Sequence, residues 1–176
     1  MSVITDNYKA GGFADGYPSN IRTYYSPVDN VHGALVEIVK SAKHSLVVAM
    51  YGWDDPELQA AIMEKVNSEH CFVQLTLDSS QAGGIHEKTL LAALNAPATS
   101  IAVGRSEKGA IMHMKCLVVD NAILVTGSTN WSDGGETKQD NACVVVYDAY
   151  VAGEATGRIS AIHANMQAKA MAISKT

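Results

Sequence analysis

Apolar residues fall into several short runs along the chain, and these runs predict β-strands. Each run has four to seven residues, which suits strands better than helices, and most are rich in β-branched residues. Residues 45–51 are apolar almost throughout, as in a central strand that is covered on both faces. Strands are expected at residues 21–25, 45–51, 71–77, 100–103, 116–119, 122–125 and 142–147.

Between the strands, apolar residues recur at spacings of three and four, which predicts helices. Asp29 is a candidate N-cap for a helix with the apolar face Val31, Ala34, Leu35, Ile38, Val39 and Ala42. Asp54-Asp55-Pro56-Glu57 predicts a capping box that opens a second helix, to about residue 67. A short helix is expected at residues 87–94. The last helix should run over about 150–171, with the inner stripe Val151, Ala155, Ile159, Ile162 and Met166.

This order of elements predicts an α/β fold, in which a mixed sheet is flanked by helices on both faces. The length of 176 residues favours a single domain. Gly11, Gly12, Gly16 and Pro18 predict that residues 1–20 form an irregular N-terminal arm, so the folded domain should span residues 21–176.

Polar residues with catalytic potential frame the pair of strands near residue 120. His113 and Lys115 are two residues apart, so they share one face of a strand, and Asp120-Asn121 is a turn signal. The hairpin then returns Ser128 and Asn130 alongside them. An imidazole can act as a nucleophile or a general acid, while an ammonium group and neutral donors can hold a developing anion. We find no cluster of carboxylates or cysteines in the sequence that suggests a metal, and we expect no cofactor.

The run His113-x-Lys115, Asp120, Gly127-Ser128-x-Asn130 resembles the HKD signature of the phospholipase D superfamily. The match is complete in type and spacing over eighteen residues, and the wider resemblance covers residues 21–171. It implies a phospholipase D-like α/β/α sandwich and a metal-independent phosphodiesterase that forms a phosphohistidine intermediate.

The sequence contains one copy of the signature, whereas an active site of this superfamily uses two. Single-copy members form homodimers, so the resemblance implies one active site shared by two subunits, with His113 of one as nucleophile and His113 of the other as acid. The other five histidines lie on predicted helices, beside strands or in a connection. Of these, only His86, in the glycine-rich connection, is a candidate substrate contact.

The resemblance also assigns roles to the remaining motif residues. Lys115 and Asn130 should hold the phosphate oxygens, and Ser128 should donate to the phosphate or position a neighbour. Asp120, although part of the signature, should support the hairpin and balance charge rather than react. Relatives often carry a glutamate on the last strand that orients the catalytic imidazole. Here that place is assigned to Asn141 on strand register, with Asp140 beside it as the alternative.

The substrate is expected to be a nucleic acid, DNA or RNA, because short single-signature members most resemble a bacterial endonuclease branch. The net charge of −5 does not favour this. However, Arg105, Lys108, Lys115 and Lys138 lie in or beside the motif. Trp131 could stack on a base, or could equally be a core or interface residue. The alternatives are a phospholipase D-type lipid phosphodiesterase and a non-catalytic, nucleic-acid-binding dimer.

The apolar runs also bear on location. None reaches eighteen residues, and the first residues carry no basic and apolar signal pattern. We find no amphipathic basic helix that would bind a lipid surface. The sequence therefore predicts a cytoplasmic protein without stable membrane association, although a processed secreted form is also compatible with it.

Overall fold

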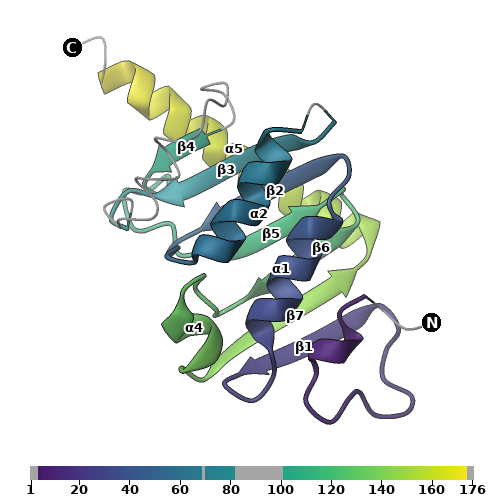
Figure 1. Cartoon of the computed structure of the whole chain (residues 1–176). Coiled ribbons are helices and arrows are strands. Elements are labelled where there is room, and N and C mark those ends of the chain that lie inside the picture. Colours follow the sequence, from purple (N-terminus) through teal and green to yellow (C-terminus); the bar gives the residue numbers. More distant parts are fainter. Residues whose placement is uncertain (1–3, 69, 82–100, 174–176) are drawn as a thin grey trace.

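A computed structural model describes residues 4–68, 70–81 and 101–173 of the chain. These residues form one mixed sheet with helices on both faces, which confirms the predicted fold class (Figure 1). The strands are β1 (Ile21–Ser26), β2 (Ser45–Met50), β3 (Phe72–Asp78), β4 (Ile101–Gly104), β5 (Lys115–Val119), β6 (Ile123–Gly127) and β7 (Asn141–Tyr147). The helices are η1 (Asp6–Tyr8), α1 (Val31–Ser41), α2 (Pro56–Val66), α4 (Asp133–Thr137) and α5 (Ala149–Ile173).

The strand order β1-β7-β6-β5-β2-β3-β4 brings the polar motif to one edge of the sheet. Strands β2, β3 and β4 are parallel, and β5 runs antiparallel to both β2 and β6. As a result, the last residues of β2, β3 and β6 lie at the same edge as the first residues of β5 and β7. We call this edge the site edge.

Two apolar layers hold the helices to the sheet. On one face, Leu35 and Ile38 of α1 and Ile62 of α2 pack against the sheet, and on the other face Ile159 and Met166 of α5 do so. Strand β2 contributes to both layers, because its successive side chains point to opposite faces. Each fully buried leucine or isoleucine contributes roughly 1.5–3 kcal/mol to folding. This burial fixes the strands that carry the motif.

Two predicted helix caps are wrong in detail. Asn30, rather than Asp29, caps α1, because its side chain accepts a hydrogen bond from the Gly33 backbone N–H. Asp29 instead accepts from the Tyr25 backbone N–H and pairs with Lys9 at 2.8 Å. Helix α2 begins with Asp55 as a single cap rather than with a capping box that starts at Asp54.

The N-terminal arm packs against β1, although the sequence suggests only an irregular segment. Thr5 is buried and accepts a hydrogen bond from the Tyr24 hydroxyl at 2.6 Å. Asp6 pairs with Arg22 at 2.6 Å. These contacts explain how a glycine-rich segment keeps a defined position beside the sheet.

The second half of the chain differs from the prediction in two places. The expected loop over residues 131–139 contains the short helix α4, which Ser132 caps by accepting from the Gly135 backbone N–H. In α5 the inner stripe begins at Ala152, whereas Val151 is exposed. The predicted helix at 87–94 and His86 lie outside the described residues. Across the ranges that are described, no helix has both the length and the apolar character needed to cross a membrane.

Candidate active site

The β5–β6 hairpin brings the four principal motif residues to the site edge. Cys116 pairs with Thr126 in the hairpin. His113, two residues before β5, and Lys115, the first residue of β5, therefore lie at the same end of the hairpin as Ser128 and Asn130, which follow β6. Lys115 also pairs with Met50 at the end of β2. The geometry therefore agrees with the expected gathering of an imidazole, an ammonium group, a hydroxyl and a carboxamide.

The His113 imidazole is exposed and held by an aromatic contact. Its ring lies 4.6 Å from the ring of Tyr51, at an interplanar angle of 65°. The neighbouring backbone is fixed as well, because the Tyr51 N–H donates to the Met114 carbonyl at 2.9 Å. Among the described residues, no hydrogen bond to a ring nitrogen of His113 is found. As far as the described residues are concerned, both nitrogens are therefore open to a ligand.

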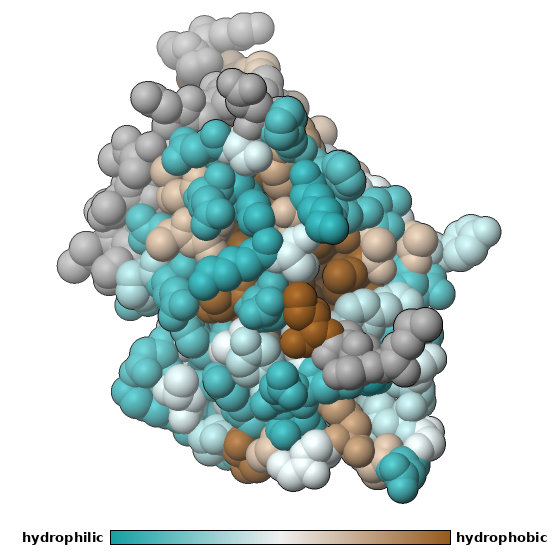
Figure 2. All heavy atoms as spheres, turned by 45° about the vertical axis from the view of Figure 1, so that its right-hand side comes forward, coloured by the Kyte–Doolittle hydropathy of each residue, from teal (hydrophilic) through white to brown (hydrophobic). Residues whose placement is uncertain are grey.

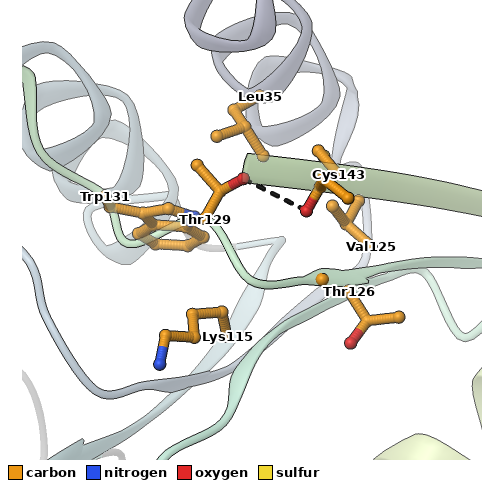
Figure 3. A pocket seen from close by; sticks show the side chains of 9 residues that line it. Leu35, Lys115, Val125, Thr126, Thr129, Trp131 and Cys143 are labelled. Atoms are coloured by element: carbon orange, nitrogen blue, oxygen red, sulfur yellow. Dashed lines mark hydrogen bonds between the residues drawn. The ribbon is translucent and has the colours of Figure 1, made fainter. Parts of the chain in front are cut away.

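Lys115 lies beneath this surface with only 7% of its area exposed. Its ammonium group donates to the His113 carbonyl at 3.1 Å and lies 4.8 Å from the Tyr51 ring centroid. Burial lowers the pKa of Lys115 below its ordinary value. Lys115 and Trp131 line a small pocket together with Thr129 (Figure 3). A poorly solvated cation here can interact strongly with an anion that enters from the site edge.

Ser128 forms a side-chain pair with Asn141 on the neighbouring strand. The Ser128 hydroxyl donates to Asn141 Oδ1 at 2.8 Å, and Asn141 Nδ2 donates to the Gly135 carbonyl at 3.0 Å. Gly127, just before Ser128, permits β6 and β7 to approach closely here. Its φ is +151°, and a Cβ atom would lie 2.0 Å from the Ala142 backbone oxygen. The expected contact of Asn141 with His113 is not found among the described residues, and each end of the Asn141 amide bonds another group. Asp140 is exposed beside this pair.

Asn130 is positioned by the segment that follows β2. Gly52 lies against its carboxamide, and a Cβ atom on Gly52 would meet Asn130 Cγ at 3.1 Å. The Gly52 carbonyl accepts from the Trp131 N–H at 2.9 Å. Asn130 Oδ1 is buried, and within the described residues it has no hydrogen-bond partner. A buried polar atom without a partner costs free energy, so Asn130 Oδ1 is an unsatisfied acceptor beside the site edge.

The structure contradicts the assignment of Trp131 as a base-stacking residue. Trp131 is 2% exposed, and its ring packs edge-on against Trp53 with centroids 5.1 Å apart. It therefore belongs to the core beneath the site, which was the alternative interpretation of the sequence.

Asp120 does not reach the reacting groups, because it lies at the other end of β5. Its carboxylate accepts hydrogen bonds from the backbone N–H groups of Lys43, His44 and Ser45 at 2.8–3.2 Å. Burial alone would raise the pKa of Asp120, but these hydrogen bonds outweigh burial, so the pKa lies below its ordinary value. The geometry therefore excludes Asp120 from the site edge and gives it the supporting role that was the preferred interpretation.

Two residues that the sequence analysis did not select also shape the site. One is Tyr51, which touches both His113 and Lys115. The other is Asp78, which is fully buried at the end of β3 and accepts from the Met112 N–H at 2.6 Å. The only signal in the sequence was their position directly at the ends of predicted strands.

Basic residues gather on the segment that leads to His113. Arg105 and Lys108 are exposed there, and α5 adds Arg158, which pairs with Glu107 at 2.9 Å, and Lys169, which bonds two carbonyls of the segment. Lys138 adds no free charge, because it pairs with Asp133. On the face drawn in Figure 2, hydrophilic residues predominate and apolar ones surface in small groups.

The expectation that no metal-ligand cluster exists is wrong. His32, Asp55 and Glu136 come from three separate segments, and their ligand-type atoms lie within 4.8 Å of one another. Burial opposes the charged imidazole, but hydrogen bonds to Glu57 and Glu136 raise the pKa of His32 to about 9. Burial and the nearby Asp55 raise the pKa of Glu136 to about 8. This cluster is separate from the motif residues.

Comparison with known proteins identifies the family. The family model "Cardiolipin synthase, PLD-like domain" matches residues 35–163. A curated phospholipase D from Rickettsia bellii is 22% identical over 138 residues, which are 76% of this chain and 64% of that protein. The chain therefore spans less than two thirds of this relative.

Solved structures agree with the fold. Nuc from Salmonella typhimurium, a phospholipase D family member, superposes with a TM-score of 0.68 at 24% identity, over 83% of this chain and 94% of Nuc. NucT from Helicobacter pylori gives 0.64 at 15% identity, over 81% and 94%. Because the family model covers most of the chain, the protein belongs to the phospholipase D superfamily.

Proposed function

We propose that the chain is a metal-independent phosphodiesterase that cleaves DNA or RNA through a phosphohistidine intermediate. One observation carries the proposal. An exposed imidazole, a buried ammonium group and an unsatisfied carboxamide lie together at the site edge. These groups match a nucleophile and its anion-stabilising partners.

In the proposed first step, a ring nitrogen of His113 attacks phosphorus. A P–N bond forms, the bond from phosphorus to the leaving oxygen breaks, and His113 of the partner subunit donates a proton to that oxygen. In the second step the partner subunit's His113 takes a proton from water. That water attacks phosphorus, the P–N bond breaks, and the nucleophile is regenerated. Lys115 and Asn130 hold the phosphate oxygens in both steps.

The shared site is supported by the number of suitable histidines. Each step needs both a nucleophile or leaving imidazole and an acid or base, but the site edge of one chain provides one exposed imidazole, within the part that is described. A two-fold axis beside His113 would supply the second. The open hollow next to Ser128, which includes the exposed side chains of Tyr25 and Val28, leaves room for a partner or a substrate.

A nucleic acid fits the site better than a lipid does. Arg105, Lys108 and Lys169 provide positive charge along the segment leading to His113, as a polyanion requires. This local charge offsets the acidic total, because binding depends on the charge near the phosphates rather than on the net charge.

The test is to incubate the protein with labelled DNA, labelled RNA and phosphatidylcholine vesicles in EDTA, beside a His113→Ala control. We expect cleavage of a nucleic acid by the wild type and inhibition by vanadate, which mimics trigonal-bipyramidal phosphorus. Cleavage of phosphatidylcholine alone would favour a lipid phosphodiesterase. Nucleic-acid binding without turnover would favour a binding protein. Loss of activity in EDTA, with the fold intact and activity restored by a divalent ion, would contradict metal independence.

A further inference from the structure

Three segments that the proposed reaction does not use converge on the side chain of His32. His32 lies on α1, Asp55 caps α2, and Glu136 lies on α4. His32 Nδ1 is 2.8 Å from Asp55 Oδ2 and 2.6 Å from Glu136 Oε2. One imidazole nitrogen thus lies close to two carboxylates, and ligand-type atoms of the three residues lie within 4.8 Å of one another.

One buried acceptor of the cluster is unsatisfied among the described residues. Glu136 is 1% exposed, and its Oε1 atom has no hydrogen-bond partner within the described part of the chain. Burial of such an acceptor without a partner is costly. Glu136 lines a hollow of about 260 Å³ together with His32 and Asp55. A small cation would find both room and an unsatisfied oxygen there.

The orientation of His32 also suits a metal. Its other ring nitrogen, Nε2, lies 2.9 Å from the Glu57 carboxylate. A carboxylate that accepts from one imidazole nitrogen fixes the tautomer and directs the second nitrogen to a metal. Once the Nδ1 proton leaves, its lone pair faces Asp55 and Glu136.

From this geometry we propose that His32, Asp55 and Glu136 form a binding site for one zinc-class divalent ion. Zinc is bound by imidazole nitrogen and carboxylate oxygen, and a site with three protein ligands leaves a fourth position for water from the hollow. Calcium would need about six to eight oxygen ligands, so this set favours a transition ion.

The ion would cross-link α1, α2 and α4, which lie next to the segments that carry the motif. Helix α4 begins shortly after Asn130, and the Asp54 N–H donates to the Trp131 carbonyl at 2.5 Å. Cross-linking α1, α2 and α4 would therefore stiffen the segments on both sides of Asn130. An ion that binds only the folded state stabilises it by mass action.

The test uses the full chain, stripped with EDTA and exchanged into metal-free buffer. Zn²⁺ binding is followed by calorimetry, and thermal unfolding is measured with and without Zn²⁺. We expect one ion per chain and a rise in Tm. Glu136→Gln and Asp55→Asn should each weaken binding by at least about tenfold. Asparagine preserves the helix cap, so Asp55→Asn should fold even if Glu136→Gln does not.

Three controls make the result specific. Asp133→Asn alters an exposed carboxylate beside the same hollow and should bind as the wild type does. His113→Ala and Cys71→Ser should also leave binding unchanged. The proposal is overturned if the wild type does not bind, if Glu136→Gln and Asp55→Asn bind normally, or if binding is lost in His113→Ala or Cys71→Ser. None of these readouts depends on phosphodiesterase activity.

Discussion

At the scale of single residues, the site combines one exposed reactive group with partners that are buried. His113 is open to solvent, whereas Lys115 and the Oδ1 atom of Asn130 are buried. The Tyr51 ring lies between the exposed imidazole and the buried ammonium group and contacts both His113 and Lys115. A low local dielectric around the buried groups strengthens their interaction with a phosphate, while the exposed imidazole stays accessible.

His113→Ala should reduce phosphodiesterase turnover by at least about a thousandfold, because it removes both the nucleophile and the acid of a shared site. Stability should change by less than about 0.5 kcal/mol, since the side chain is exposed. His44→Ala is the matched control, because His44 is also exposed but lies before β2, at the opposite edge. Turnover of the His113 variant within tenfold of the wild type would reject the nucleophile assignment.

At the scale of elements, the β5–β6 hairpin is held at both ends. At the site edge Ser128 and Asn141 join β6 to β7, and at the far edge Asp120 binds the segment that enters β2. Asp120 has a φ of 51°, a backbone conformation that asparagine also tolerates. The motif therefore places His113 and Lys115 at the site edge of one hairpin and Asp120, as a support, at its other end.

Asp120→Asn should lower the free energy of unfolding by about 1–3 kcal/mol at pH 7, because a charged acceptor of three backbone bonds is replaced by a neutral one. The folded-state pKa of Asp120 lies below its ordinary value, so its contribution is complete above the unfolded value of about 3.9. The contribution is lost as the pH falls through the lower folded value. The difference between variant and wild type in urea denaturation should therefore shrink at acid pH.

Because Asp120 supports the fold and lies far from the reacting groups, its replacement should have little effect on catalysis. Turnover of folded Asp120→Asn should stay within roughly tenfold of the wild type, in contrast to His113→Ala. Asp15→Asn, a change of an exposed carboxylate in the arm, controls for net charge. A pH-independent difference in stability, or a loss of turnover comparable to that of His113→Ala, would contradict the assignment.

At the scale of the whole molecule, the open site edge is the feature that the proposed reaction needs. The sheet places His113 at a surface rather than inside a closed pocket. A second copy of the chain could therefore bring its own His113 to the same phosphate. The activity of the protein should then depend on association.

Sedimentation should reveal a dimer of about twice 18.7 kDa, and activity per subunit should fall on dilution below the dissociation constant. Mixing His113→Ala with an excess of Lys115→Ala should not restore a full site, because each heterodimer has a single site that lacks one histidine and one lysine. A fully active monomer, or recovery of nearly half the activity on mixing, would refute the shared site and leave His113 as the nucleophile.

The sequence by itself determined the strands, the two helical layers and the meeting of His113, Lys115, Ser128 and Asn130. These features follow from periodicity and from fixed spacing along one hairpin, which are local properties of the chain. The far position of Asp120 was also implicit in its spacing, since five residues along a strand cover about 16 Å.

Only the tertiary structure decided the burial of Trp131 against Trp53, the contact of Tyr51 with His113, and the partners of Asn141. It alone brought together His32, Asp55 and Glu136, which no motif connects. Contacts of this kind join residues that are distant in the chain. They depend on how whole helices pack against the sheet, and local periodicity carries no information about that packing.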